Sequence, residues 1–177
     1  MPLTYRPDLA NCTGRVHPVN DRRKDRPDRI VIHRNTAGNK WAKDNNFQGS
    51  AVEALHHFHA EPGRWSFRIF PYHYFIDEAG EITKVHDELT VSPHARNRGN
   101  WRSIGIALNI DGRKQAPTPQ MHESLVWLCS DILFRWPNSA IMGHSAAKRC
   151  PGPLVNVSKI ETEARELWAS LGGGAAP

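Results

Sequence analysis

The sequence is poor in cysteine, in long apolar runs and in repetition. Its 177 residues contain three cysteines, an odd number that is too small for a disulfide framework. Such sparse cysteine is typical of a reducing compartment or of one metal or nucleophile site. No segment approaches the roughly 20 consecutive apolar residues that a membrane helix needs, so we expect no membrane insertion. Low complexity is confined to the final GGGAAP.

The N-terminal residues lack the pattern of a conventional signal peptide, because no apolar run of roughly 7 to 15 residues follows a basic start. We therefore expect synthesis in the cytoplasm. The formal net charge is only +5, and residues 21–29 mix five cations with three anions. This mixture differs from a dedicated basic arm, so we expect no nucleic-acid partner.

The composition is that of a folded protein, with 39% hydrophobic residues, and the length favours one domain. A domain of this size buries about 70% of its unfolded surface without needing disulfides. We predict a solvated lead-in segment over residues 1–28, a single folded domain over residues 29–171 and a flexible tail over residues 172–177.

Three segments combine an N-cap signal with apolar residues at helical spacing: residues 50–60, residues 119–135 and residues 158–171. The first and the third open with a capping box, Ser50 with Glu53 and Ser158 with Glu161. The second follows Thr118 and begins with a proline, which is favoured at the first helical position. These patterns predict three helices.

Three other segments carry strand or hairpin patterns: residues 30–33, residues 71–85 and residues 103–110. In the last segment every second residue from Ile104 is apolar and the residues between are small, which lets another group approach the sheet closely. Alternation in the hairpin predicts Tyr72 and Tyr74 on one face. The Asn and Gly content of residues 34–40 predicts a loop. Strands interspersed with helices indicate an α/β layered domain.

The segment IMGHSAAKRCPGP holds the densest chemistry, because His144, Lys148 and Cys150 lie within seven residues. Cations beside Cys150 are expected to lower the pKa of its thiol. A histidine with a cysteine suits zinc, provided that a third ligand comes from elsewhere in the chain. The residues alone leave three possibilities open: a zinc site, a cysteine nucleophile paired with His144, or an ordinary partly buried Cys and His.

Four blocks in order, IVIHRNTAGN, PYHYFIDEAGEI, HARNRGNWRSIGIAL and GHSAAKRCPGP, resemble the zinc-dependent N-acetylmuramoyl-L-alanine amidases, of the type shared by peptidoglycan recognition proteins and small bacteriophage lysozymes. The likeness covers about residues 29–170. It implies a central mixed β-sheet flanked by helices, with one zinc ion per chain in a groove. Matched block by block, it implies His33, His144 and Cys150 as the zinc ligands.

The resemblance also implies further site residues. The active-site tyrosine of the family falls on Tyr72 and its lysine on Lys148, while His94 and Asn100 fall at positions where a substrate contact is expected. Family members that use a strand glutamate place it where this chain has Ala107, so the tyrosine and lysine version is the better match. The six-residue step from His144 to Cys150 is short for the family, so the loop carrying Lys148 must be tight.

The activity implied is hydrolysis of the amide between the lactyl group of N-acetylmuramic acid and the L-alanine of the stem peptide. We expect a monomeric phage or prophage endolysin that acts on peptidoglycan or a muropeptide, reaching the wall after release, and a positive charge suits an anionic wall. The alternatives are a cytoplasmic muropeptide-recycling amidase, a non-catalytic peptidoglycan-binding or regulatory protein, and a metal-free cysteine hydrolase.

Overall fold

The two longest strands of a six-stranded sheet, Arg29–Arg34 and Ser103–Leu108, pair with each other in parallel. The computed structural model describes residues 3–10, 26–61, 70–95, 98–145 and 149–174. The strands are β1 (Leu3–Tyr5), β2 (Arg29–Arg34), β3 (Tyr74–Ile76), β4 (Ile82–Lys84), β5 (Ser103–Leu108) and β6 (Ala140–Gly143). Their order is β1-β4-β3-β5-β2-β6, and only the β3–β4 hairpin pairs antiparallel. The predicted mixed sheet is thus confirmed.

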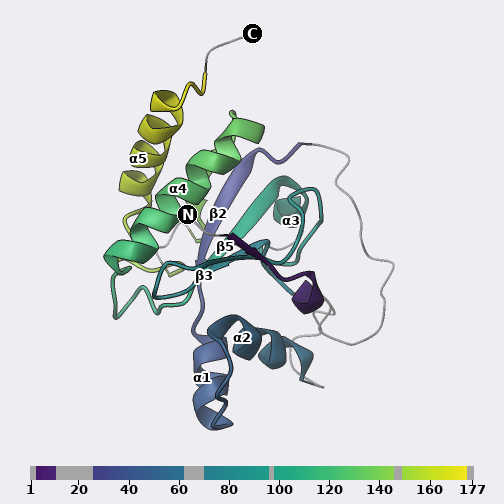
Figure 1. The fold of residues 1–177 in the computed structure, drawn as a ribbon. Helices are drawn as coiled ribbons and strands as arrows, with labels where there is room; N and C mark the ends of the chain where they lie inside the picture. The colour runs from purple at the N-terminus through teal and green to yellow at the C-terminus, as the bar shows by residue number, and fades with distance from the viewer. Residues whose placement is uncertain (1–2, 11–25, 62–69, 96–97, 146–148, 175–177) are drawn as a thin grey trace.

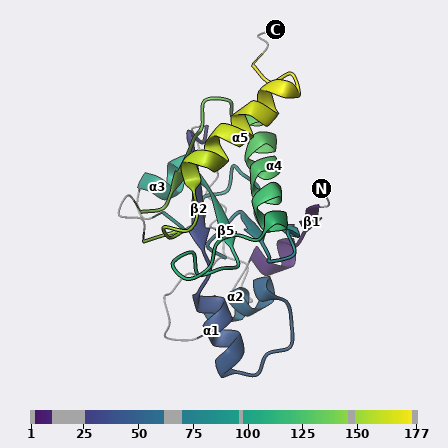
Figure 2. The same cartoon turned by 90° about the vertical axis from the view of Figure 1, so that its left-hand side faces the viewer.

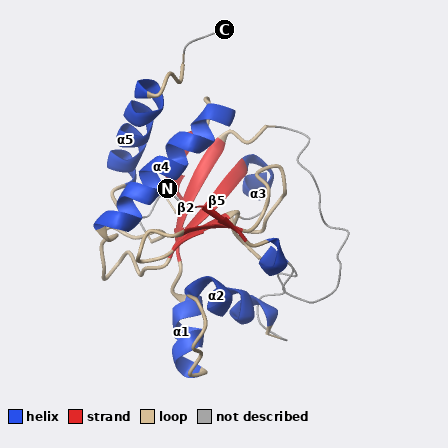
Figure 3. Ribbon diagram, viewed as in Figure 1, coloured by secondary structure: helices blue, strands red, loops and turns tan. Residues whose placement is uncertain are grey.

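The helices are a 3-10 turn (Pro7–Ala10), α1 (Ala37–Asp44), α2 (Ala51–Ala60), α3 (Arg98–Arg102), α4 (Pro119–Arg135) and α5 (Val157–Ser170). Figure 1 and Figure 2 show α4 and α5 side by side along one face of the sheet. Helices α1 and α2 lie beyond the carboxyl end of β2, as the secondary-structure colouring of Figure 3 makes clear. None of the helices in these described ranges is long and apolar enough to cross a membrane.

The sheet face under α4 and α5 carries the larger apolar core. Alternate residues of β5, beginning with Ile104, pack there against Leu125 and Leu128 of α4 and Ile160 of α5. Ala107 points the other way and joins a second cluster with residues of α2. The predicted alternation of β5 is therefore confirmed, with its small residues on the face away from α4.

The hairpin departs from the alternation predicted for it. Tyr74 packs in the core under α4, whereas Tyr72 packs against the opposite cluster that contains Phe70 and Phe75. Regular strand begins only at Tyr74, so the two-residue period does not extend back to Tyr72. The prediction that Tyr72 and Tyr74 share a face is wrong, and this places Tyr72 on the side of the sheet away from α4.

Residues 37–40, predicted as part of a loop after β2, instead form the start of α1. Gly38, which suggested a turn, is needed for packing, because a Cβ there would lie 2.9 Å from the Leu55 Cα of α2. Its N–H donates to Asn35 Oδ1 over 3.0 Å, which holds the first turn of the helix. The Gly and Asn residues thus serve a close helix contact rather than a loop.

The helix caps follow the sequence in two of three cases. The Ser50–Glu53 capping box opens α2, and Thr118 Oγ1 accepts from the Met121 N–H at the start of α4. Helix α5 begins two residues earlier than predicted, because Asn156 rather than Ser158 caps it by accepting from the Lys159 N–H. An Asn at this position competes well with Ser as an N-cap.

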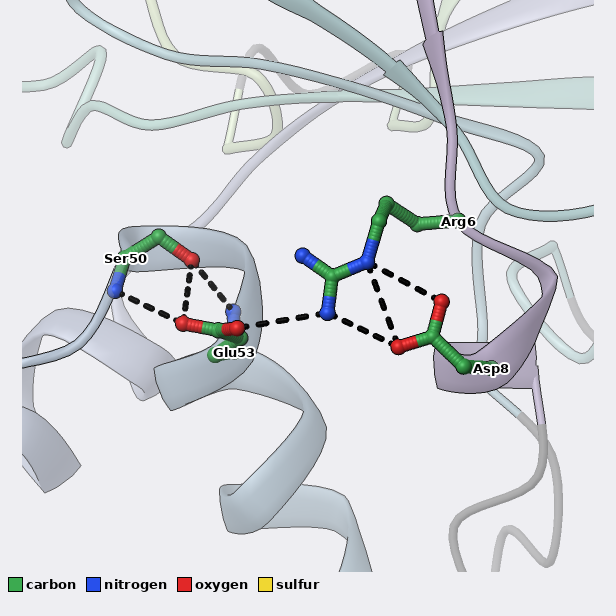
Figure 4. Close-up of polar contacts among 4 residues, drawn as sticks. All are labelled: Arg6, Asp8, Ser50 and Glu53. Carbon is green, nitrogen blue, oxygen red and sulfur yellow. Dashed lines mark hydrogen bonds and ion pairs between the residues drawn. The ribbon is translucent and has the colours of Figure 1, made fainter.

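The N-terminal residues contribute to the sheet. Strand β1 pairs parallel with β4 at the sheet edge. Figure 4 shows the guanidinium of Arg6 between Asp8 and the Glu53 carboxylate, which also completes the capping box with Ser50. Part of the predicted lead-in segment is therefore folded against α2, while the domain boundaries themselves stay a prediction.

Candidate metal and catalytic site

Three potential metal ligands meet beside the carboxyl end of β2. His33 lies near the end of that strand, and His144 follows β6, which pairs with β2 in parallel. The His144 N–H donates to the Ile32 carbonyl over 3.1 Å, while Ser145 N–H donates to the Cys150 carbonyl and turns the chain back. One ligand atom from each of His33, His144 and Cys150 lies within 4.8 Å of the others.

The spacing of these atoms suits a tetrahedral ion. Zinc bonds to nitrogen and sulfur at their usual lengths imply an N–S separation of about 3.6 Å across a tetrahedral site. The His33 Nδ1 atom and the Cys150 Sγ atom are 3.8 Å apart. The rings of His33 and His144 lie with centroids 4.5 Å apart. Two imidazoles and one thiol therefore converge as a zinc site with an open fourth position requires.

Electrostatics favour a neutral His33 and a protonated Cys150 in the absence of a cation. Burial lowers the pKa of His33 well below its usual value, and His94 and His144 nearby lower it further. Burial raises the pKa of the Cys150 thiol, and Arg34 offsets the rise only in part. The expected lowering of this pKa is wrong, because burial outweighs the neighbouring charge. A thiol in this state is a poor nucleophile unless a cation stabilises its thiolate.

Tyr72 lies against the ligand cluster. Its ring centroid is 5.0 Å from that of His33. Burial raises the pKa of the Tyr72 phenol well above its usual value, and the nearby Cys150 adds to the rise. The hydroxyl is therefore protonated at neutral pH and able to donate a hydrogen bond.

His94 and Asn100 both make contacts within the protein. His94 is buried, with 6% of its surface exposed, and its Nδ1 lies 3.0 Å from His33 Nε2. Asn100 Oδ1 accepts from the Ala95 N–H over 2.6 Å and thereby holds the loop before β5. The structure brings His94 to the cluster and gives Asn100 a loop-holding contact, and a substrate contact by either residue stays a prediction.

The profile described as N-acetylmuramoyl-L-alanine amidase matches residues 23–153, which is well over half of the chain and includes all three candidate ligands. The chain belongs to this amidase family. Among curated proteins, no sequence match was found.

Several solved structures share the fold. The Ph2119 endolysin from the Thermus scotoductus MAT2119 bacteriophage Ph2119 is 20% identical with a TM-score of 0.69, over 92% of this chain and 99% of that one. The N-acetylmuramoyl-L-alanine amidase LysC from Clostridium intestinale URNW is 19% identical with a TM-score of 0.63, over 93% and 98%. Wild-type Drosophila PGRP-LB is 21% identical with a TM-score of 0.65, over 91% and 93%.

Two hollows flank the ligand cluster of this amidase-family chain. One of about 700 Å³ is bordered by His144, Cys150 and the start of α5. The other, of about 220 Å³, is bordered by Tyr72, Arg34 and residues of α2. Lys148, the remaining predicted catalytic residue, lies outside the described residues. The larger hollow thus borders two of the three candidate ligands, and the smaller one borders Tyr72.

Sequence reasoning missed two residues, His73 and Ser103, that lie against the His94 ring. His73 Nδ1 accepts from the Gly105 N–H, and its Nε2 donates to the Thr90 carbonyl. Ser103 contacts His94 Nε2 through both its carbonyl and its hydroxyl oxygen. The sequence feature that could have indicated this packing was the small-residue face of β5, because that face accommodates the His94 ring.

Proposed function

We propose that this chain is a zinc-dependent N-acetylmuramoyl-L-alanine amidase. The reaction consumes one water, breaks the amide C–N bond between the lactyl group and L-alanine, and leaves a lactyl carboxylate and a free L-alanine amino terminus. The observation that carries the proposal is the convergence of His33, His144 and Cys150 within 4.8 Å, in a chain of the amidase family. The resemblance in sequence assigns the same three residues as ligands.

Each site residue has a role in this proposal. His33, His144 and Cys150 hold one zinc ion, which when bound supplies Lewis acidity and an acidified water. Tyr72, protonated because burial raises its pKa, donates to the substrate carbonyl or orients the attacking water. Lys148 offsets the negative charge that develops on the carbonyl oxygen.

An endolysin of a phage or prophage is the biological role that we propose. The similarity in fold to the Ph2119 endolysin supports it, and the net charge of +5 suits approach to an anionic wall. A muropeptide-recycling amidase would perform the same bond cleavage on soluble fragments. Comparing turnover of intact walls with turnover of soluble muropeptides separates the two roles.

Digestion of purified peptidoglycan tests the chemistry. Mass spectrometry is expected to find new L-alanine amino termini with intact glycan chains. New reducing sugar ends would contradict the amidase, and no products at all would favour a non-catalytic peptidoglycan-binding protein.

Chelation tests the metal in the same assay. Hydrolysis is expected to stop when zinc is removed and to return when zinc is added back. His33→Ala should lose both zinc and hydrolysis, whereas His57→Ala, which removes an exposed histidine of α2, should keep both. Hydrolysis that persists in the chelated protein would favour the metal-free cysteine hydrolase.

A further inference from the structure

A chain of hydrogen bonds leads from the candidate ligand His33 to the backbone of β5. His33 Nε2 and His94 Nδ1 are 3.0 Å apart. On the far side of its ring, His94 Nε2 lies 3.1 Å from the Ser103 carbonyl oxygen and 3.2 Å from the Ser103 hydroxyl oxygen. Both ring nitrogens of His94 therefore have partners within the protein.

The partners fix the direction of each hydrogen bond. The Ser103 hydroxyl donates its single proton to the Gly99 carbonyl over 2.5 Å, so its oxygen is an acceptor toward His94. The Ser103 carbonyl oxygen is an acceptor in any case. His94 Nε2 must then carry the proton, which leaves Nδ1 of the neutral ring as an acceptor. His33 Nε2–H is then the donor in the contact between the two histidines.

This direction determines which nitrogen of His33 is available to a metal. With its proton on Nε2, the neutral His33 ring has its lone pair on Nδ1, the atom that lies 3.8 Å from Cys150 Sγ. The opposite tautomer would place a proton between Nδ1 and the sulfur and would block coordination. A second hydrogen-bonding partner is how metal-binding histidines are commonly held in one tautomer.

We propose that His94 is a positioning residue that holds His33 in the Nε2–H tautomer, so that Nδ1 is the ligand atom for zinc. The inference rests on the proposed zinc-dependent function, and it gives His94 a role distinct from the substrate contact that the sequence predicts. This role concerns the tautomer of His33, and the three proposed ligand residues stay the same.

The surroundings of His94 hold its ring in place. A Cβ at Gly105 would lie 2.7 Å from His94 Cγ, so only glycine lets the ring lie this close to β5. The His73 ring lies edge-on to His94, with centroids 5.6 Å apart. His73 accepts a hydrogen bond from the Gly105 N–H. Strand β5, the His73 ring and the His94 ring are therefore connected through direct contacts.

Two substitutions of similar shape test the role of His94 Nδ1 as a hydrogen-bond acceptor. His94→Asn and His94→Leu have nearly the same shape and both lose Nε2, but only Asn offers an oxygen near the place of Nδ1. Zinc affinity, measured by competition with a chromophoric chelator, is expected to fall about 10- to 100-fold in His94→Leu. His94→Asn should recover most of this loss. Equal affinities of the two folded variants would overturn the proposal.

Imidazole nitrogen NMR reads the tautomer directly in zinc-free wild-type protein, whether or not either variant folds. We expect the proton on Nε2 of both His33 and His94. A proton on His33 Nδ1 would overturn the proposal even if the enzyme binds zinc and hydrolyses peptidoglycan. Wild-type protein that binds no zinc would instead overturn the proposed function. In that case the observed tautomer of His33 would still establish the direction of its hydrogen bond with His94.

Substrate kinetics separate positioning from substrate contact. If His94 acts only through His33, the zinc-saturated His94→Asn variant should keep the wild-type KM. A raised KM with wild-type zinc affinity would support the substrate contact and overturn the positioning role.

Discussion

At the scale of the residue, burial determines what Tyr72 can do. A phenol whose pKa is raised by burial stays protonated throughout the neutral range, so it can donate a hydrogen bond but does not serve as a base there. Its ring centroid lies 5.0 Å from that of His33, so this donor belongs to the immediate surroundings of the ligand cluster.

Tyr72→Phe removes this donor and keeps the ring that packs against Phe70. Folding and zinc binding should be retained, while kcat should fall about 10²- to 10³-fold, as for loss of another oxyanion-type donor. The pH profile provides a second measurement. Because the pKa of Tyr72 is raised, wild-type activity should show no loss from its ionisation up to about pH 10, its usual value. A wild-type kcat in Tyr72→Phe would remove the residue from the mechanism.

At the scale of the element, the sequence predicted those features that depend on residues close together in the chain. The cap of α4 depends on one side chain and the N–H three residues later, so Thr118 is recognisable without the fold. Helix α1 escaped prediction because Gly38 is explained by its contact with Leu55 seventeen residues away. The small face of β5 was visible in the sequence, but the ring that occupies it was not.

Gly105 offers a test of that face. Gly105→Ala leaves every polar group of the site in place, yet its Cβ would lie 2.7 Å from the His94 ring and force that ring to move. We expect weaker zinc binding, about 10-fold or more, as for loss of an outer partner of a ligand. Thermal unfolding of the zinc-free protein controls for damage to β5. Unchanged zinc affinity would mean that the ring and its contacts adjust without consequence.

Helix α4 is tied to the sheet through the buried carboxylate of Glu88. Arg135 donates to both of its oxygens, and Tyr74 and Trp136 donate one hydrogen bond each. Burial alone would raise the pKa of Glu88, but these donors outweigh it and hold the pKa below its usual value. The carboxylate is 7% exposed, so its partners are not easily replaced by water.

Glu88→Gln should therefore destabilise the fold by about 2 kcal/mol at neutral pH. A carboxyl whose pKa is lowered on folding stabilises the protein above its unfolded pKa, and this contribution disappears as pH falls through the folded pKa. The difference in Tm between wild type and variant should thus shrink below about pH 4. Asp131→Asn, which breaks a more exposed pair with the same arginine, should cost less than about 1 kcal/mol. A pH-independent difference would contradict this account.

At the scale of the whole molecule, the site depends on strand order. His33 and Cys150 are 117 residues apart in the chain. They meet because β6 pairs in parallel with β2, with Gly143 beside Ile32, so that the carboxyl ends of both strands lie at one edge of the sheet. The sequence predicted the strand and the ligand residue types, but periodicity contains no information on which strands are neighbours. The resemblance to the amidase family supplied this missing information, because it assigned His33, His144 and Cys150 to one site.

Because the proposed ligands come from the end of β2, the residue after β6 and the loop that follows it, a zinc ion would connect segments that the backbone leaves separate. An ion that binds only the folded state stabilises it by about 2.7 kcal/mol when free zinc is about one hundred times Kd. For a chain of this size, that corresponds to a rise of about 5–10 °C in Tm. The rise should be reversed by a chelator and absent in His33→Ala, yet kept in His57→Ala, where the cluster is intact. An equal rise in His33→Ala would place the stabilising ion elsewhere, because one histidine and one thiol no longer provide the three ligands on which this cross-link depends.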